Sequence, residues 1–240
     1  MKKRSVLIRG AVFVVLLIAV VATGFRYYAA DYYTAKAYEV VTEKVQETEN
    51  YIIYGDTNSA RGFIFYPGAK VEETAYAPIL DELAETDICC VVVKMPYHLA
   101  VLDMDAAEQV MQELPEVEQW YIGGHSLGGA MAAVYAAKHE SELTGLILLA
   151  AYPTDTLEKL PVLSIYGSED TVLNHEKYED SISMAKHLTE RVIEGGNHAG
   201  FGNYGAQKGD GEAEISDEEQ WQETVDYILN YMQVYVEDVE

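Results

Sequence analysis

The chain has 240 residues, and its hydrophobic fraction of 49% is enough for one large core. It carries 40 acidic residues against 16 basic ones, which gives a formal net charge of −24 at pH 7. Proteins that bind nucleic acid neutralise phosphates with clustered Lys and Arg, so this balance argues against nucleic acid as a partner.

The first 26 residues differ from the rest in charge and hydropathy. They hold five basic residues and no acidic one, and Gly10 to Phe25 is a run without any charge. Extended back to Val6, the run reaches the length of about 20 residues that a membrane-spanning helix needs, if Arg9 extends to the headgroups. Because the positive charge lies at the N-terminal end, we expect a single-pass membrane anchor with its N-terminus inside and the remainder exported.

A cleaved signal peptide is the alternative for this segment, since 22–24 and 28–30 contain the small residues of a cleavage site. Either interpretation places the following domain outside the cytoplasm. Without the five basic residues of the segment, 11 remain against 40 acidic ones, and such a surface repels anionic lipid headgroups. We therefore expect a membrane segment at 1–26 that alone contacts the membrane, a connecting arm at 27–50 and one globular domain at 51–240.

The domain begins with apolar runs and continues as an alternation of strands and helices. The runs 51–54 and 62–66 predict a hairpin-like pair, and 38–45 before them predicts an edge strand or an ordered arm. The further predicted strands are 88–94, 119–122, 145–150, 161–166 and 191–194, and the predicted helices are 76–85, 103–114, 127–139, 175–188 and 217–236. This pattern predicts an α/β fold with a mostly parallel central sheet and helices on both faces.

The two cysteines, Cys89 and Cys90, are neighbours inside an apolar predicted strand. Adjacent residues of a strand point to opposite faces of the sheet, so a disulfide between these two would distort the chain. We expect both to be buried free thiols.

A glycine-rich motif, GGHSLGG at 123–129, follows one of these strands and precedes an alanine-rich helix. Ser126 therefore lies at a strand-to-helix corner, with Gly124 and Gly128 two residues to either side. In a nucleophile elbow the backbone of such a serine is strained, the glycines give the chain room, and the hydroxyl is lifted off the sheet. The alternative is a glycine-rich packing turn with an idle serine.

Two later strand ends supply the partners that a weakly nucleophilic serine needs. Asp170 follows the strand at 161–166, and His198 follows the strand at 191–194. In parallel sheets the reactive groups gather beyond the carboxyl ends of the strands, and the order Ser, Asp, His is the one that this type of sheet imposes. Glu169 is an alternative to Asp170.

With these three motifs, the chain resembles the α/β-hydrolase family, and in particular its compact bacterial members. The resemblance covers roughly 63–232 and rests on a PGGK-like strand end, the GGHSLGG elbow and a GGNHAQFG-like histidine loop. It implies that 51–240 is a catalytic domain with Ser126 as nucleophile, Asp170 as orienting acid and His198 as general base. It also implies an oxyanion hole formed by the amides of Leu127 and Ala69, and a site without metal or organic cofactor.

Residues around the expected site suggest how it meets a substrate. Phe201 and Tyr204 lie in a glycine-rich segment after the histidine, which we expect to cover part of the mouth of the site. His98 follows a strand and is a further candidate for the pocket wall, and the alternative for it is a position in a surface loop. The segment 151–160 is too short for a large cap, so we expect an open, shallow pocket for a small ester. The acidic residues that follow, beginning with Asp210, are expected to form a solvated face.

The sequence thus predicts a serine hydrolase that acts on a small-molecule carboxylic ester or a related acyl bond. A peptidase or an acyltransferase with the same triad is an alternative, and a lactone or dienelactone hydrolase is a neighbouring one, although relatives acting on dienelactones often have cysteine in place of the serine. From a different class, an inactive binding module at the cell surface would retain the fold without turnover.

Overall fold

The computed structural model describes residues 2–237 and divides into two compact units between Tyr32 and Tyr33. The first unit is formed by the helix α1 (Lys2–Ala30). Its portion Val12–Ala30 has a mean hydropathy of 2.0 and is long and apolar enough to cross a membrane. The same length and composition suit a signal sequence, so the helix is compatible with both interpretations of the N-terminal segment.

The second unit is built on one sheet with the strand order β1-β2-β4-β3-β5-β6-β7-β8. Its strands are β1 (Val45–Glu47), β2 (Tyr51–Tyr54), β3 (Arg61–Tyr66), β4 (Ile88–Val93), β5 (Gln119–His125), β6 (Gly145–Leu149), β7 (Leu157–Gly167) and β8 (Ala185–Ile193). Its α-helices are α2 (Ala77–Ala84), α3 (Ala106–Glu113), α4 (Leu127–Lys138), α5 (His175–Ile182) and α6 (Asp217–Glu237). Short 3-10 helices are η1 (Glu73–Tyr76), η2 (Pro96–His98), η3 (Ala100–Leu102), η4 (Glu140–Glu142) and η5 (Ala199–Phe201).

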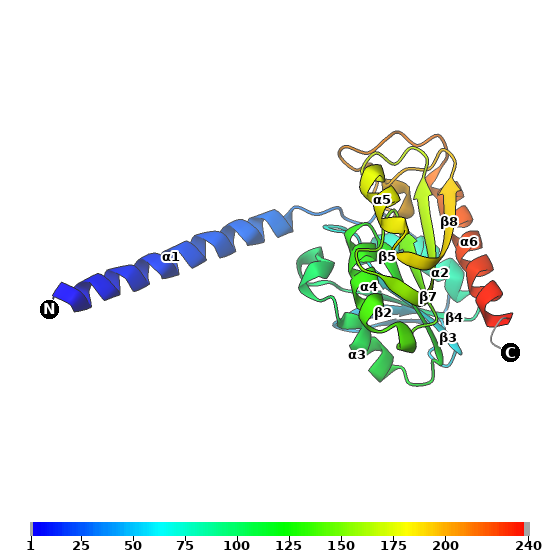
Figure 1. Cartoon of the computed structure of the whole chain (residues 1–240), viewed down its shortest axis with the longest axis horizontal. Helices are drawn as coiled ribbons and strands as arrows, with labels where there is room; N and C mark the ends of the chain where they lie inside the picture. Colours follow the sequence, from blue (N-terminus) through cyan, green and yellow to red (C-terminus); the bar gives the residue numbers. More distant parts are fainter. Residues whose placement is uncertain (1, 238–240) are drawn as a thin grey trace. The chain divides into compact units, whose positions relative to one another are not determined.

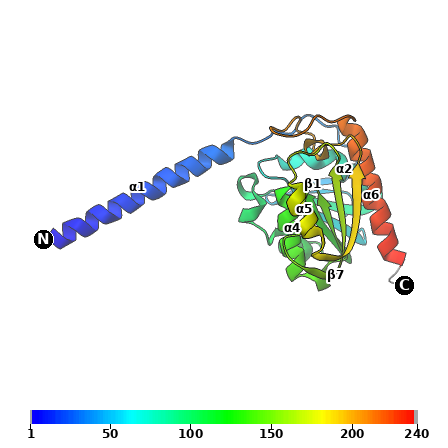
Figure 2. The ribbon, with the colours of Figure 1, turned by 45° about the horizontal axis from the view of Figure 1, so that its top comes forward.

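The sheet is parallel from β4 to β8, and the antiparallel strands are β1 and β2. One apolar core lies between the sheet and the helices α2 and α6, and a second lies between the opposite face and the helices α3 and α4. Figures 1 and 2 show α6 in red on one side of the sheet and α4 in green on the other. The predicted α/β architecture, with a mostly parallel sheet, helices on both faces and no large cap, is confirmed.

The expected hairpin between the runs 51–54 and 62–66 is wrong. β2 pairs antiparallel with β4, with Ile52 opposite Val92, and β3 lies on the far side of β4 in parallel orientation. All four residues of β2 are buried, and the hairpin partner of β2 is the short edge strand β1. Apolar runs of this kind show that a strand is buried but carry no information about its neighbour.

The helix predicted at 175–188 is too long. α5 ends at Ile182, and Ala185 already belongs to β8, where it pairs with Leu157. β8 is an edge strand with mostly polar, partly exposed residues, so its sequence lacks the apolar signal of the central strands. β7 is correspondingly longer than predicted and contains an irregularity between Leu157 and Pro161. β8 begins at Ala185, six residues before the predicted strand at 191–194, and of the segment 38–45 only Val45 belongs to a strand, the edge strand β1. The remaining predicted elements agree with the structure to within about three residues at each end.

The connecting arm is folded onto the domain from Tyr33 onward. The carboxylate of Asp81, which is fully buried, accepts hydrogen bonds from the Tyr38 hydroxyl at 3.1 Å and from the amides of Val41 and Thr42 at 2.6 and 2.9 Å. These bonds compensate for the loss of water around the carboxylate. Residues 33–50 therefore belong to the same compact unit as the sheet. Cys89 and Cys90, on β4, are buried free thiols as predicted.

Candidate active site

Ser126 lies between the last residue of β5 and the first residue of α4. Its backbone has φ of 52° and ψ of −122°, a conformation that is costly for any residue with a side chain. Hydrogen bonds on both sides hold the corner: the Ser126 amide donates to the Leu149 carbonyl at 2.9 Å, and the Ala130 amide donates to the Ser126 carbonyl at 3.0 Å. The predicted strand-to-helix corner is present, with the strained serine that a nucleophile elbow requires.

The glycines of the motif are needed because the end of β3 runs close to the corner. A Cβ added to Gly128 would lie 2.3 Å from the carbonyl oxygen of Pro67, and one added to Gly124 would lie 2.8 Å from the main chain of Gly128. Backbone atoms cannot move aside at these distances, so only glycine fits both positions. The close approach also brings the turn after β3 against the elbow.

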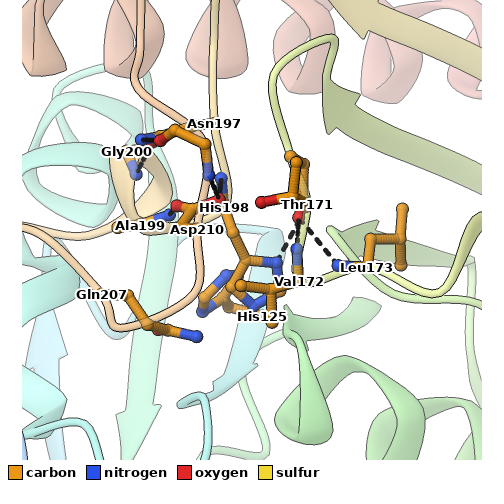
Figure 3. A network of polar contacts seen from close by, with 12 residues as sticks. His125, Thr171, Val172, Leu173, Asn197, His198, Ala199, Gly200, Gln207 and Asp210 are labelled. Carbon is orange, nitrogen blue, oxygen red and sulfur yellow. Dashed lines mark hydrogen bonds and ion pairs between the residues drawn. The ribbon is translucent and has the colours of Figure 1, made fainter.

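Asp170 and His198, which are separated by 28 residues in sequence, are in direct contact. Asp170 Oδ2 lies 2.8 Å from His198 Nδ1, and both side chains are buried, at 0% and 2% exposure. Asp170 Oδ1 accepts hydrogen bonds from the amides of Val172 and Leu173 at 2.9 and 2.8 Å, and Figure 3 labels these two donors. The carboxylate is therefore held in one orientation toward the imidazole, and Glu169 does not take its place.

One cavity joins the elbow to the histidine. It has a volume of about 270 Å³, and Ser126 and His198 both lie on its wall. Its other lining residues come from α4, the segment after β6 and the turn before α5; they are Leu127, Ala130, Ala150, Ala151, Tyr152, Thr154, Val172, Leu173 and Asn174. The lining includes no Asp, Glu, Lys or Arg, and most of its residues are Ala, Leu or Val. The wall is therefore mostly apolar.

The main chain of His198 is held by an acidic residue that the sequence did not mark. Asp210 accepts hydrogen bonds from the His198 amide at 3.3 Å and from the Ala199 amide at 2.8 Å, and Figure 3 shows it beside this turn. The Asn197 side chain also accepts from the Gly200 amide at 2.8 Å. The expectation that Asp210 belongs to a solvated face is therefore wrong, because its carboxylate faces the histidine loop.

A second histidine lies against the first. His125, which precedes the serine, is 1% exposed, and its ring centroid is 4.5 Å from that of His198. The Tyr76 hydroxyl lies 2.9 Å from His125 Nδ1 and accepts a hydrogen bond from the Gly68 amide at 2.9 Å. Burial, followed by the positive charge of His198 when protonated, holds the pKa of His125 well below its usual range. His125 is therefore a neutral side chain.

The two candidate oxyanion residues come from the elbow itself and from the turn after β3. Leu127 is the first residue of α4 and lines the cavity, so its amide is one of the helix-end donors without an intrahelical acceptor. Ala69 is half-buried in the turn after β3, between the amide of Gly68 and the amide of Lys70, which donates to the His98 carbonyl at 2.8 Å. Ala69 is not among the residues that line the cavity.

The three residues expected to contact substrate lie elsewhere. Phe201 has no exposed surface and packs on His125 with ring centroids 5.8 Å apart, because η5 turns this segment into the core. Tyr204 is 7% exposed, with its hydroxyl 3.0 Å from Gln207, and His98 lies 3.6 Å from Glu73. None of the three lines the cavity, and the glycine-rich segment does not form its wall. The lining residues that sequence reasoning missed, such as Tyr152 and Leu173, lie in loops without a motif.

Solved structures with the same fold match most of the chain at low identity. Est1E from Butyrivibrio proteoclasticus is 16% identical with a TM-score of 0.59, over 79% of this chain and 98% of that chain. A predicted CIB-like hydrolase from Thermoplasma acidophilum is 17% identical with a TM-score of 0.58, over 78% and 99%. Thermogutta terrifontis esterase 2, phosphonylated by sarin, is 12% identical with a TM-score of 0.58, over 81% and 95%. No match to a curated protein sequence was found.

The family model for the alpha/beta hydrolase family matches residues 62–222, which is well over half of the chain. The matched range starts in β3, ends in α6 and includes Ser126, Asp170 and His198. The resemblance inferred from the three sequence motifs is confirmed, and the chain belongs to the alpha/beta hydrolase family.

Proposed function

We propose that this chain is a serine hydrolase that cleaves a carboxylic ester or a related acyl bond. The observation that carries the proposal is the buried contact of 2.8 Å between His198 Nδ1 and Asp170 Oδ2, with His198 and Ser126 on the wall of one cavity. His198 Nε2 has no hydrogen-bond partner among residues 2–237, so it is available to a proton from the serine. Membership of the alpha/beta hydrolase family and the fold shared with esterases support the same activity.

In the proposed reaction, His198 Nε2 takes the proton of the Ser126 hydroxyl as the serine oxygen attacks the acyl carbonyl carbon. Asp170 orients the imidazole and stabilises the imidazolium that forms. The amides of Leu127 and Ala69 donate to the oxyanion of the tetrahedral intermediate. The imidazolium then gives its proton to the departing alkoxide. Water that the same imidazole deprotonates hydrolyses the acyl-enzyme and returns the serine.

The cavity favours a small, uncharged acyl group. Its volume of about 270 Å³ and its alanine-rich wall offer no Lys or Arg to pair with an acidic substrate and no Asp or Glu to pair with a basic one. A short aliphatic ester fits this wall better than a long acyl chain. The acidic composition of the domain outside the cavity opposes substrates with anionic groups near the reacting bond.

The helix α1 indicates on which side of the membrane the proposed reaction takes place. Its basic N-terminal residues and its apolar portion Val12–Ala30 favour a single-pass anchor with the N-terminus inside and the catalytic domain outside the cytoplasm. Secretion after signal cleavage is the alternative. Mass spectrometry of the purified chain distinguishes the two, because cleavage would remove Met1 to about residue 24 or 30.

The test of the proposed reaction is labelling with a fluorophosphonate probe together with hydrolysis of p-nitrophenyl acetate. We expect the wild type to be labelled and active, and Ser126→Ala to lose labelling and to fall to the background rate, because the variant lacks the proposed nucleophile. Ser183→Ala, which changes an exposed serine after α5, is the matched control and should behave as the wild type. Labelling that persists in Ser126→Ala would contradict the proposal.

A further inference from the structure

The hydroxyl of Tyr76 lies where three parts of the proposed site meet. Tyr76 is the last residue of η1, is fully buried, and lies outside the cavity lining. Its oxygen is 2.9 Å from the Gly68 amide nitrogen and 2.9 Å from His125 Nδ1. Gly68 precedes Ala69, the proposed second oxyanion donor, and His125 precedes Ser126.

The donors and acceptors at this hydroxyl favour one arrangement. The Gly68 amide can only donate, so the tyrosine oxygen accepts there and its single hydrogen is left for His125 Nδ1. His125 is then a neutral imidazole whose remaining proton is on Nε2, a buried atom without a hydrogen-bond partner among residues 2–237. The opposite tautomer would direct two donors at the hydroxyl and leave two buried groups unpaired, the Tyr76 hydrogen and the Nε2 lone pair, which is more costly.

The geometry leaves little freedom around this contact. A Cβ on Gly68 would lie 2.7 Å from His125 Nδ1 and 2.9 Å from Tyr76 Oη, so the turn is pressed against both side chains. The Tyr76 ring packs on Phe65 with centroids 4.7 Å apart, and it lies 5.8 Å from the His125 ring. Movement of the tyrosine would therefore displace the turn after β3 and the imidazole together.

His125 also lies against His198, the proposed base. The His125 ring is 4.5 Å from the His198 ring at an interplanar angle of 51°, and Phe201 packs on His125 from the same loop as His198. Because the hydrogen bond to Tyr76 fixes the orientation of the His125 ring, that ring restricts the movement of the His198 ring packed against it. His198 is thus hydrogen-bonded to Asp170 through Nδ1 and packs against the tilted ring of His125.

We infer that Tyr76 and His125 are positioning residues for acyl transfer, which align the oxyanion turn and the His198 ring through one buried hydroxyl. The inference rests on the proposed function, and neither residue touches the substrate. It predicts an effect on turnover with little effect on substrate binding, because the cavity wall is made of other residues.

The test compares two single hydroxyl deletions. Tyr76→Phe keeps the ring and removes the bridge, and we expect kcat for p-nitrophenyl acetate to fall about tenfold to a hundredfold while KM changes less than about twofold. Tyr66→Phe is the matched control, because the Tyr66 hydroxyl is likewise buried and makes two hydrogen bonds, although both are to backbone groups. It accepts from the Ala107 amide at 2.8 Å and donates to the Met104 carbonyl at 2.9 Å, in the core on the other face of the sheet. This variant should lose thermal stability to a similar degree and retain kcat.

A second measurement is independent of turnover. In the full chain labelled with ¹⁵N-histidine, the signals of His125 are those missing from the spectrum of His125→Asn. The titratable groups that face His125 are Tyr76 and His198. We expect the His125 ring to show the neutral Nε2–H tautomer from about pH 8 to about pH 5 in the wild type, and to lose the single tautomer in Tyr76→Phe.

The outcomes separate the two proposals. Equal kcat losses in Tyr76→Phe and Tyr66→Phe, or a His125 ring that titrates at the ordinary histidine pKa of about 6.5, would overturn the positioning role. A wild type that is neither labelled nor active on esters would overturn the proposed function, and the ¹⁵N spectra would still decide whether Tyr76 holds His125.

Discussion

Two histidines at the ends of β5 and β8 are equally buried and yet have different surroundings. His125 and His198 are each 1% exposed, and their rings are in contact. His198 Nδ1 meets a buried carboxylate, whereas His125 Nδ1 meets the hydroxyl of Tyr76, which has no charge to offer. A buried cation is costly without a charged partner, so the surroundings allow only one of the two imidazoles to become protonated during a reaction.

Burial and proximity to the serine therefore do not distinguish the proposed base from its neighbour. His125 is adjacent to Ser126 in sequence and fully enclosed, but it has no carboxylate. His198 is 72 residues away in sequence and lies opposite Asp170. What distinguishes the two sites is the partner on the second ring nitrogen, which fixes the tautomer and provides the charge that stabilises the imidazolium.

The largest loss of activity is expected when Asp170, the partner of His198 Nδ1, is changed. Asp170→Asn keeps the shape of the side chain and removes its charge, so His198 loses both its tautomer and the stabilisation of its positive form. We expect kcat/KM for p-nitrophenyl acetate to fall about 10³- to 10⁴-fold, with the thermal unfolding midpoint little changed.

The matched control for Asp170→Asn is Glu169→Gln, at the neighbouring residue that was the alternative acid. Glu169 contacts the Ser168 hydroxyl at 3.1 Å and does not meet the imidazole, so its variant should keep kcat/KM within about twofold. If Glu169→Gln lowered kcat/KM more than Asp170→Asn, Glu169 and not Asp170 would be the acid that supports His198.

The parts of the site that could be read from the sequence are those where a local motif follows a strand. Ser126, Asp170 and His198 each follow an apolar run and a glycine-marked turn, and parallel strands bring such turns to one edge of the sheet. The fold class was predictable for the same reason, because buried strands and amphipathic helices alternate along the chain.

The remaining parts depend on contacts that have no local signal. The Tyr76–His125 contact joins residues 49 positions apart, and Asp210 reaches back 12 positions to the His198 amide. The walls of the cavity come from ordinary loop residues such as Tyr152. The end of α5 and the pairing of β2 depend on which strands lie side by side, because β8 pairs with β7 from Ala185 and β2 pairs with β4. Hydrophobic periodicity predicts the type of an element but not its neighbours.

The lowered pKa of His125 predicts that the folded chain loses stability as the pH falls. The folded chain keeps this side chain neutral, whereas the unfolded chain binds a proton below the ordinary pKa of about 6.5. The unfolded state therefore binds more protons below this pH, and the stabilisation that is complete above about pH 6.5 is lost as the pH falls, by up to about 1.4 kcal/mol per pH unit for this one group.

Urea unfolding of the full chain in detergent between about pH 8 and about pH 5 measures this slope. His125→Asn carries no titrating group there and places an oxygen near the position of Nδ1 for the Tyr76 hydroxyl, so its unfolding free energy should fall less steeply below about pH 6.5. The absolute stability of the variant is lower because of the lost ring volume, and the comparison is made between slopes. Parallel slopes would mean that His125 binds its proton as readily in the folded chain as in the unfolded one, which would contradict the lowered pKa.

The smallest effect is expected beyond His198, in the glycine-rich segment that contains Tyr204. This tyrosine is 7% exposed, its ring packs on Tyr33 at 5.4 Å, and its hydroxyl meets Gln207 at 3.0 Å near the surface. Tyr204→Phe removes one neutral hydrogen bond outside the cavity, so kcat and KM on a series of p-nitrophenyl esters should both stay within about twofold of the wild type. A rise in KM that grows with acyl length would place this segment at the substrate after all, and the loop that carries the proposed base would then also bind substrate.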